Sequence, residues 1–258
     1  MRFFFTAVIF VCTTAGQPEL VSGTKPNLER VVAAAYIDAG LVTSHAVSFG
    51  GASIKYLQAG SLDSTKTLIF CHGAAYSAHT WQLVGALDAA AAQGMAALAI
   101  DLPGYNGSGH PSSVPRDAFV RTFAEAIGVR GSVLVVSASM GGTYALPFVL
   151  SPGPFTIAGY VTIAGSISAL SGGGVRSGVP ALVIFGDQDA RLATDRAPYE
   201  HAFERSQVVV FEHAPHPCYL RDVAAAQYFT DLLVEFAGGT AVQTQYALTQ
   251  RAAWGSEL

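Results

Sequence analysis

Residues 133–148 read VLVVSASMGGTYALPF, and this stretch decides the fold class. It opens with branched apolar residues, turns through small residues at 137–142, and continues as a helix-like apolar run. A short, continuous apolar run is typical of a strand that is buried on both faces of a parallel sheet. The stretch therefore predicts one strand–turn–helix unit of an α/β domain.

Other segments of the chain have the β-branched or apolar composition of strands. We predict eight strands, at residues 41–49, 53–58, 67–71, 95–101, 132–137, 159–164, 181–186 and 208–211. Gly50-Gly51 indicates a hairpin between the first two. Helical patterns fall at residues 80–93, 114–128, 140–150, 196–205 and 222–236. Strands that alternate with helices predict a mostly parallel eight-stranded sheet with helices on both faces.

The composition of the 258 residues excludes several classes of partner. The chain is 51% hydrophobic and 12% charged, with a formal net charge of −4. Nucleic-acid binding needs a basic stripe, and the 14 Lys and Arg residues are scattered, so we expect no nucleic-acid partner. His213 and His216 have the spacing of metal ligands but lack further ligands nearby, so we expect no metal and no cofactor.

The two ends of the chain differ from its middle. Residues 1–16 contain one basic residue, an apolar run and then small residues, which is the order of a secretory signal peptide. The run is shorter than the roughly 18 apolar residues that indicate a membrane span. We predict a cleaved signal and a secreted chain, with a membrane anchor or a cytoplasmic location as alternatives. The folded domain is expected at residues 24–238 and a polar tail at 239–258.

Polar residues follow the carboxyl ends of the predicted strands, where ligands bind in an open parallel sheet. Ser139 follows the fifth strand, Asp187 and Asp189 follow the seventh, and His213 and His216 follow the last. The chain order serine, acid, histidine predicts a nucleophilic triad. The histidine would take the serine proton, and the carboxylate would hold the imidazole in the correct tautomer. Either acid and either histidine is placed suitably for these roles.

The turn at Ser139 departs from the usual G-x-S-x-G pentapeptide, because Ser137 stands at the first glycine position. In such a turn the nucleophile adopts a positive φ, and the residues two before and two after it pass close together. Those residues must be small, and Ser137 and Gly141 are small. Ser139 is therefore the predicted nucleophile, with Ser137 as the next candidate. The oxyanion would bind the backbone N–H groups of Met140 and Ala74.

Five segments together resemble the α/β-hydrolase superfamily: IFCHGAAYSAHTWQ, AIDLPGYNGSG, VVSASMGGTYALPF, ALVIFGDQD and HAPHPCYL. Within it, the chain is most similar to the alpha/beta hydrolase domain-containing protein fourteen family, which also has serine at the start of this turn. The resemblance covers residues 41–236 and implies Ser139 as nucleophile, Asp189 as acid and His216 as base. It implies a serine hydrolase of carboxylesterase type that acts on small acyl esters or acyl amides. Alternatives are a protein-lysine deacylase and a non-catalytic module that binds a protein partner.

Further residues near the predicted site have expected supporting roles. Asp101 resembles the structural acid of the superfamily's D-x-P-G turn, and His72 is expected to hold the oxyanion loop through hydrogen bonds. The link at residues 165–180 contains three consecutive glycines and leaves no room for a helical cap. We therefore expect an open, cap-less site for small acyl groups or for an acylated side chain of a larger partner.

Two cysteines and one asparagine near the site allow two interpretations each. Cys71 and Cys218 do not make a disulfide framework, so we expect two buried free thiols, with a disulfide between them as the alternative in a secreted chain. Asn106-Gly107-Ser108 is a glycosylation sequon, but we favour an Asn-Gly turn.

Overall fold

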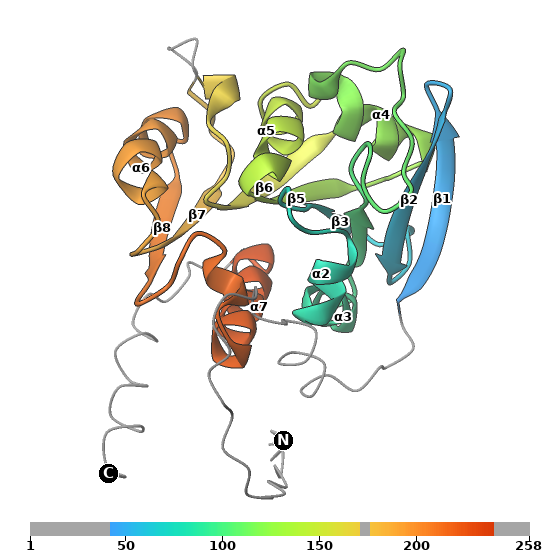
Figure 1. Cartoon of the computed structure of the whole chain (residues 1–258). Helices are drawn as coiled ribbons and strands as arrows, with labels where there is room; N and C mark the ends of the chain where they lie inside the picture. Colours follow the sequence, from blue (N-terminus) through green and yellow to red (C-terminus); the bar gives the residue numbers. More distant parts are fainter. Residues whose placement is uncertain (1–41, 171–175, 240–258) are drawn as a thin grey trace, which may run out of the picture.

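An eight-stranded sheet forms the centre of the computed structural model, which describes residues 42–170 and 176–239 (Figure 1). The spatial order of the strands is β1-β2-β4-β3-β5-β6-β7-β8. β2 pairs antiparallel with both β1 and β4, and the other neighbouring strands are parallel. The mostly parallel sheet predicted from the sequence is thus confirmed, with strands β1 (Thr43–Phe49), β2 (Ala52–Ala59), β3 (Lys66–Cys71), β4 (Ala96–Ile100), β5 (Ser132–Ala138), β6 (Thr156–Ile163), β7 (Ala181–Gly186) and β8 (Ser206–Phe211).

Helices cover both faces of this sheet (Figure 1). One face carries α2 (His79–Leu83), α3 (Ala86–Ala92) and α7 (Val223–Ala237), and the other carries α4 (Phe119–Ala126), α5 (Gly142–Leu150) and α6 (Arg191–Ala202). Each face has its own hydrophobic core, as expected for a sheet that is buried on both sides. Short 3₁₀ turns complete the fold: η1 (Arg116–Ala118), η2 (Ser139–Gly141), η3 (Ser168–Leu170) and η4 (Cys218–Leu220).

Two helices differ from the sequence-based prediction. The single helix expected at residues 80–93 is split into α2 and α3, because the chain turns at Gly85 with φ 75°. Helix α6 begins at Arg191 rather than at residue 196, two residues after Asp189, whose carboxylate accepts a hydrogen bond from the Arg191 backbone N–H. That early start places the acid one residue before Ala190, the N-cap of the helix.

The two cysteines are free and buried, as expected, and the alternative of a disulfide between them is wrong. Cys71 ends β3 and packs in the core beneath α4 and α5. Cys218 lies in η4 and packs in the core beneath α2, α3 and α7. The thiols therefore lie on opposite faces of the sheet, although both residues neighbour the predicted site along the chain.

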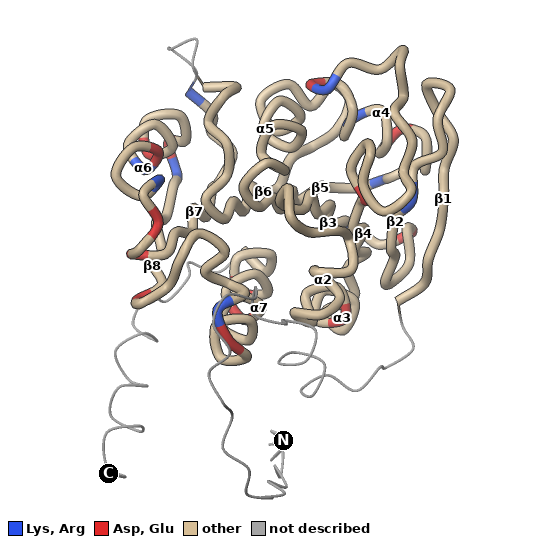
Figure 2. The backbone as a smooth tube through the Cα atoms, in the orientation of Figure 1, with Lys and Arg blue, Asp and Glu red and all other residues tan. Residues whose placement is uncertain are grey.

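Charged residues lie mainly on helices and loops, with Lys55 in β2 and Lys66 at the start of β3 (Figure 2). Strands β4 to β7 contain none, which agrees with their burial. None of the helices in the described ranges is long and apolar enough to cross a membrane.

Several sequence-based predictions concern segments that lie outside the described residues. These are the signal peptide at 1–16, the tail beyond Gly239 and the run of three glycines within residues 171–175. The boundaries proposed at residues 24 and 238 remain predictions. In the link between β6 and β7, the structure describes one 3₁₀ turn, η3.

Candidate active site

Three side chains from separate loops meet at the carboxyl edge of the sheet. The Oγ of Ser139 lies 2.8 Å from Nε2 of His216. Nδ1 of the same imidazole lies 2.7 Å from Oδ2 of Asp189. These residues follow β5, β8 and β7, so the parallel topology brings together positions that are far apart in the sequence.

The turn around Ser139 depends on small neighbours. Ser139 has φ 47°, a conformation that non-glycine residues rarely adopt. A Cβ added at Gly141 would lie 2.3 Å from the carbonyl oxygen of Cys71, so only glycine lets the turn pack against β3. The backbone N–H of Ser166 donates to the carbonyl of Ser139 over 3.0 Å and fixes the strained residue from the other side.

Both carboxylate oxygens of Asp189 accept hydrogen bonds. Oδ1 accepts from the backbone N–H of Arg191 at 3.0 Å, while Oδ2 faces the imidazole of His216. The Asp189 side chain is 5% exposed and the His216 side chain is 38% exposed. The acid is therefore held in one orientation beneath the imidazole, and the imidazole itself remains accessible to a substrate.

The rival acid and the rival histidine lie outside this hydrogen-bonded chain. Asp187 is exposed, and its Oδ1 accepts the backbone N–H of Ala214 at 3.0 Å. Hydrogen bonds from the backbone of His213 and Ala214 hold the pKa of the Asp187 carboxyl below its usual value. His213 is exposed and has φ 54°. Asp187 thus ties the end of β7 to the loop after β8, which carries His216.

Ser137 is completely buried. Its hydroxyl lies 2.8 Å from the hydroxyl of Tyr160 in β6. A side chain in this position does not meet a substrate, so the accessible hydroxyl of the turn belongs to Ser139.

His72 lies at the base of the loop that contains Ala74. The buried imidazole accepts the Leu102 backbone N–H at Nε2 over 3.1 Å, so its proton sits on Nδ1 and is donated to the Gly73 carbonyl at 2.8 Å. Burial lowers the pKa of His72, which keeps the ring neutral. A Cβ added at Gly73 would lie 3.6 Å from the Ser139 Cβ, so this loop passes beside Ser139. Ala74 is exposed, and its N–H and that of Met140 remain the predicted oxyanion donors.

Asp101 connects two loops at the same edge of the sheet. Its carboxylate accepts the backbone N–H of Ala78 and the side-chain amide of Asn106, both at 2.9 Å. Asn106 and Gly107 have φ 45° and 83°, and the Ser108 N–H donates to the Tyr105 carbonyl, which makes the favoured Asn-Gly turn. The amide of the sequon is thus used inside the protein.

The sequence reasoning missed two residues that line or support this site. Arg191 donates from Nη1 to the carbonyl of Ala164, at the end of β6, over 3.1 Å. The Tyr105 hydroxyl donates to the sulfur of Met140 at 3.2 Å, and its ring meets His72 edge-on with centroids 4.9 Å apart. An arginine two residues after the acid and an aromatic residue after Asp101 are the only sequence signals for them.

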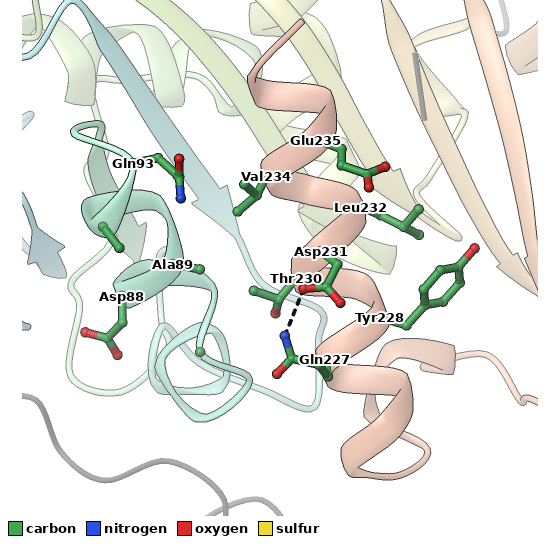
Figure 3. A pocket seen from close by; sticks show the side chains of 12 residues that line it. Asp88, Ala89, Gln93, Gln227, Tyr228, Thr230, Asp231, Leu232, Val234 and Glu235 are labelled. Carbon is green, nitrogen blue, oxygen red and sulfur yellow. Dashed lines mark hydrogen bonds between the residues drawn. The ribbon is translucent and has the colours of Figure 1, made fainter. Parts of the chain in front are cut away.

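A separate groove of about 680 Å³ lies between α3 and α7 (Figure 3). Its lining includes Asp88, Asp231 and Glu235, but neither Ser139, Asp189 nor His216. Within the described ranges, no group of three or more His, Cys, Asp or Glu side chains is arranged to hold a metal ion. The meeting point of Ser139, His216 and Asp189 is therefore the candidate active site.

Comparison with known proteins agrees with the fold described above. Residues 68–256 match the alpha/beta hydrolase family. The chain belongs to this family. It is 33% identical over 173 residues to the Pongo abelii protein named "Putative protein-lysine deacylase ABHD14B", covering 62% of this chain and 79% of that protein. It is 35% identical over 161 residues to "Protein ABHD14A" of Danio rerio, covering 59% of this chain and 58% of that protein.

A solved structure shares the fold of this alpha/beta hydrolase. The CIB-like hydrolase from Thermoplasma acidophilum aligns with a TM-score of 0.68 and 18% identity, covering 77% of this chain and 98% of that one. These relatives confirm the resemblance to the alpha/beta hydrolase domain-containing protein fourteen family that was inferred from the sequence.

Proposed function

We propose that this alpha/beta hydrolase is a serine hydrolase of carboxylesterase type that cleaves small acyl esters or acyl amides. The observation that carries the proposal is the continuous chain Asp189–His216–Ser139, with distances of 2.7 and 2.8 Å, ending on a serine at φ 47°. A serine hydroxyl becomes a useful nucleophile when an oriented base accepts its proton, and this chain supplies both the base and its orienting acid.

The reaction would proceed in two steps, acylation of Ser139 and hydrolysis of the acyl-enzyme. His216 Nε2 takes the proton of Ser139 as Oγ bonds to the substrate carbonyl carbon, and the oxyanion accepts hydrogen bonds from the N–H groups of Met140 and Ala74. The intermediate then expels the alcohol or amine, which receives the proton from His216, and the acyl group stays on Ser139. In the second step His216 takes a proton from water as the water oxygen bonds to the acyl carbon, and it returns this proton to Ser139 Oγ as the Oγ–acyl bond breaks and the acid is released. The Asp189 carboxylate stabilises the imidazolium through its contact with Nδ1 of His216.

The surroundings of the triad favour small or projecting acyl groups. The 38% exposure of the His216 side chain supports an open site. The link between β6 and β7 is too short for a cap of several helices, so a long acyl chain would have little protein to enclose it. A short acyl group such as acetyl, carried by a small ester or by a protein side chain, fits this arrangement.

A second candidate is deacylation of protein lysines, the activity for which the ABHD14B relatives are named. Amide cleavage uses the same nucleophile and base, so the geometry permits both substrates. The proposed signal peptide would place a secreted form of this chain apart from cytosolic and nuclear lysines. The third candidate, a non-catalytic binding module, does not require the three triad side chains to be aligned as they are.

One experiment tests the proposal. Wild-type protein and Ser139→Ala are treated with a fluorophosphonate probe and assayed with p-nitrophenyl esters of increasing acyl length and with an acetyl-lysine peptide. We expect labelling and ester turnover in the wild type only, fastest with short acyl groups. If the wild type releases acetate from the acetyl-lysine peptide faster than it hydrolyses the p-nitrophenyl esters, the deacylase is favoured. Absence of labelling and turnover in both proteins would support the binding module, and labelling of Ser139→Ala would contradict the assignment of the nucleophile.

A further inference from the structure

A run of buried hydroxyl groups lies directly beneath the turn that carries Ser139. Ser137 in β5 pairs in register with Thr162 in β6, and Tyr160 lies two residues before Thr162 on the same face. Tyr199 reaches this face from α6. All four side chains are completely buried.

The contacts link these hydroxyls in one line. Ser137 Oγ lies 2.8 Å from the Tyr160 hydroxyl and 3.4 Å from Thr162 Oγ1. Thr162 Oγ1 lies 3.5 Å from the hydroxyl of Tyr199, which donates to the carbonyl of Ser166 at 3.4 Å. The last three contacts are long for hydrogen bonds donated by hydroxyl groups, so each is weaker than the 2.8 Å contact between Ser137 and Tyr160.

The directions of these hydrogen bonds follow from the final acceptor. The carbonyl of Ser166 can only accept, so Tyr199 gives its proton there, and Thr162 must then donate to Tyr199. Ser137 in turn donates to Thr162, and Tyr160 donates to Ser137. Each hydroxyl therefore donates once, and the line runs in one direction from Tyr160 to the Ser166 peptide.

The Ser166 peptide connects this line to Ser139. Its carbonyl accepts from Tyr199, and its N–H donates to the carbonyl of Ser139 at 3.0 Å. The adjacent Gly165 allows the close fit, since a Cβ there would lie 2.1 Å from Thr162 Oγ1 and 2.9 Å from the Tyr199 hydroxyl. The strained φ of Ser139 is thus held from the buried side by a peptide that is itself fixed at both ends.

We propose that Ser137 and Tyr199 are positioning residues, which act through the Ser166 peptide to hold Ser139 at the angle required for attack. This proposal rests on the proposed function, because it assigns a purpose to the geometry of its nucleophile. It also gives Ser137 a role that glycine at the same position does not supply. A glycine there would leave the Tyr160 hydroxyl without its closest partner in a buried site.

The test compares Ser137→Ala, Tyr199→Phe and the double variant with Tyr228→Phe as control. Tyr228 lies in the α3–α7 groove, on the other face of the sheet. Two quantities are measured: exchange of the Ser166 amide hydrogen with deuterium, followed in peptides covering residues 160–168, and kcat with KM for p-nitrophenyl acetate. Thermal unfolding confirms that each variant is folded at the assay temperature.

We expect each single variant to speed exchange at Ser166 and to lower kcat by about tenfold, the effect of roughly one neutral hydrogen bond, with KM unchanged. The double variant should lose little more than either single variant, because both break the same line. Tyr228→Phe should match the wild type in both measurements.

The outcomes that overturn the proposal are separate from those that overturn the proposed function. Unchanged exchange at Ser166 in both variants contradicts the structural link. Faster exchange with unchanged kcat shows that the line stabilises the fold without positioning Ser139. A wild-type protein that hydrolyses no ester or amide refutes the proposed function and with it the positioning role, whereas the exchange data still report whether the hydroxyl line fixes Ser166.

Discussion

Replacing Asp189 by Asn tests the assignment of the acid most sharply, because the structure fixes how the new side chain must sit. The Arg191 N–H lies 3.0 Å from Oδ1 and requires an acceptor, so the amide oxygen of Asn takes that position. The amide NH₂ is then directed at Nδ1 of His216, 2.7 Å from the present carboxylate oxygen. The imidazole must accept there, which moves its own proton to Nε2.

That change of tautomer removes the base. With a proton on Nε2, His216 donates to Ser139 across the 2.8 Å contact and cannot take the serine proton. Loss of the correct tautomer in a serine–histidine–acid triad lowers kcat by about 10⁴, or about 5.5 kcal/mol of transition-state stabilisation. The fold should survive, because both hydrogen bonds of residue 189 are replaced by others of similar geometry.

The matched control is Asp187→Asn. This exposed side chain can still accept the Ala214 N–H through its amide oxygen, so we expect turnover within about threefold of wild type. Both variants are compared by p-nitrophenyl acetate hydrolysis and fluorophosphonate labelling at pH 7.5, with circular dichroism to verify folding. If Asp189→Asn stays within tenfold of wild type while Asp187→Asn loses more than a hundredfold, the acid has been assigned to the wrong residue.

Three further predictions concern the supports of the site. Gly141→Ala should lower the melting temperature and abolish ester turnover, because its Cβ would lie 2.3 Å from the Cys71 carbonyl, whereas Gly178→Ala meets nothing within 4 Å; equal melting temperatures would contradict this packing. The lowered pKa of His72 means that the unfolded chain binds its proton more readily, so its contribution to stability is complete above about pH 6.5 and is lost as the pH falls further; urea midpoints at pH 7.5 and 5.5 measure this, and they should differ less in His72→Gln. Burial raises the pKa of Cys71 and of Cys218 to about 12, so iodoacetamide should alkylate both only after unfolding, and native modification seen by peptide mapping would show that a core opens.

The fold and the meeting of the triad were predictable because both depend on chain order. Buried strands leave continuous apolar runs such as residues 133–136, and parallel pairing then brings the ends of β5, β7 and β8 to one edge. The side-chain contacts depend on which face of the sheet a residue occupies, and sequence proximity does not report this. Cys71 and Cys218 illustrate the difference, since each neighbours a site residue along the chain but they pack in separate cores.

Ser137 shows the same limit in a more informative way. From the sequence, serine at the first position of the turn is a small residue that replaces glycine, and size alone explains why it is tolerated. In the structure its register with Thr162 points the hydroxyl into a core that already contains Tyr160 and Tyr199. Those tyrosine hydroxyls need partners because they are buried, and glycine would provide none. Hence the residue that weakens the match to the hydrolase pentapeptide belongs with the polar residues beneath it, and the four positions should be read as one unit when this turn is compared with others.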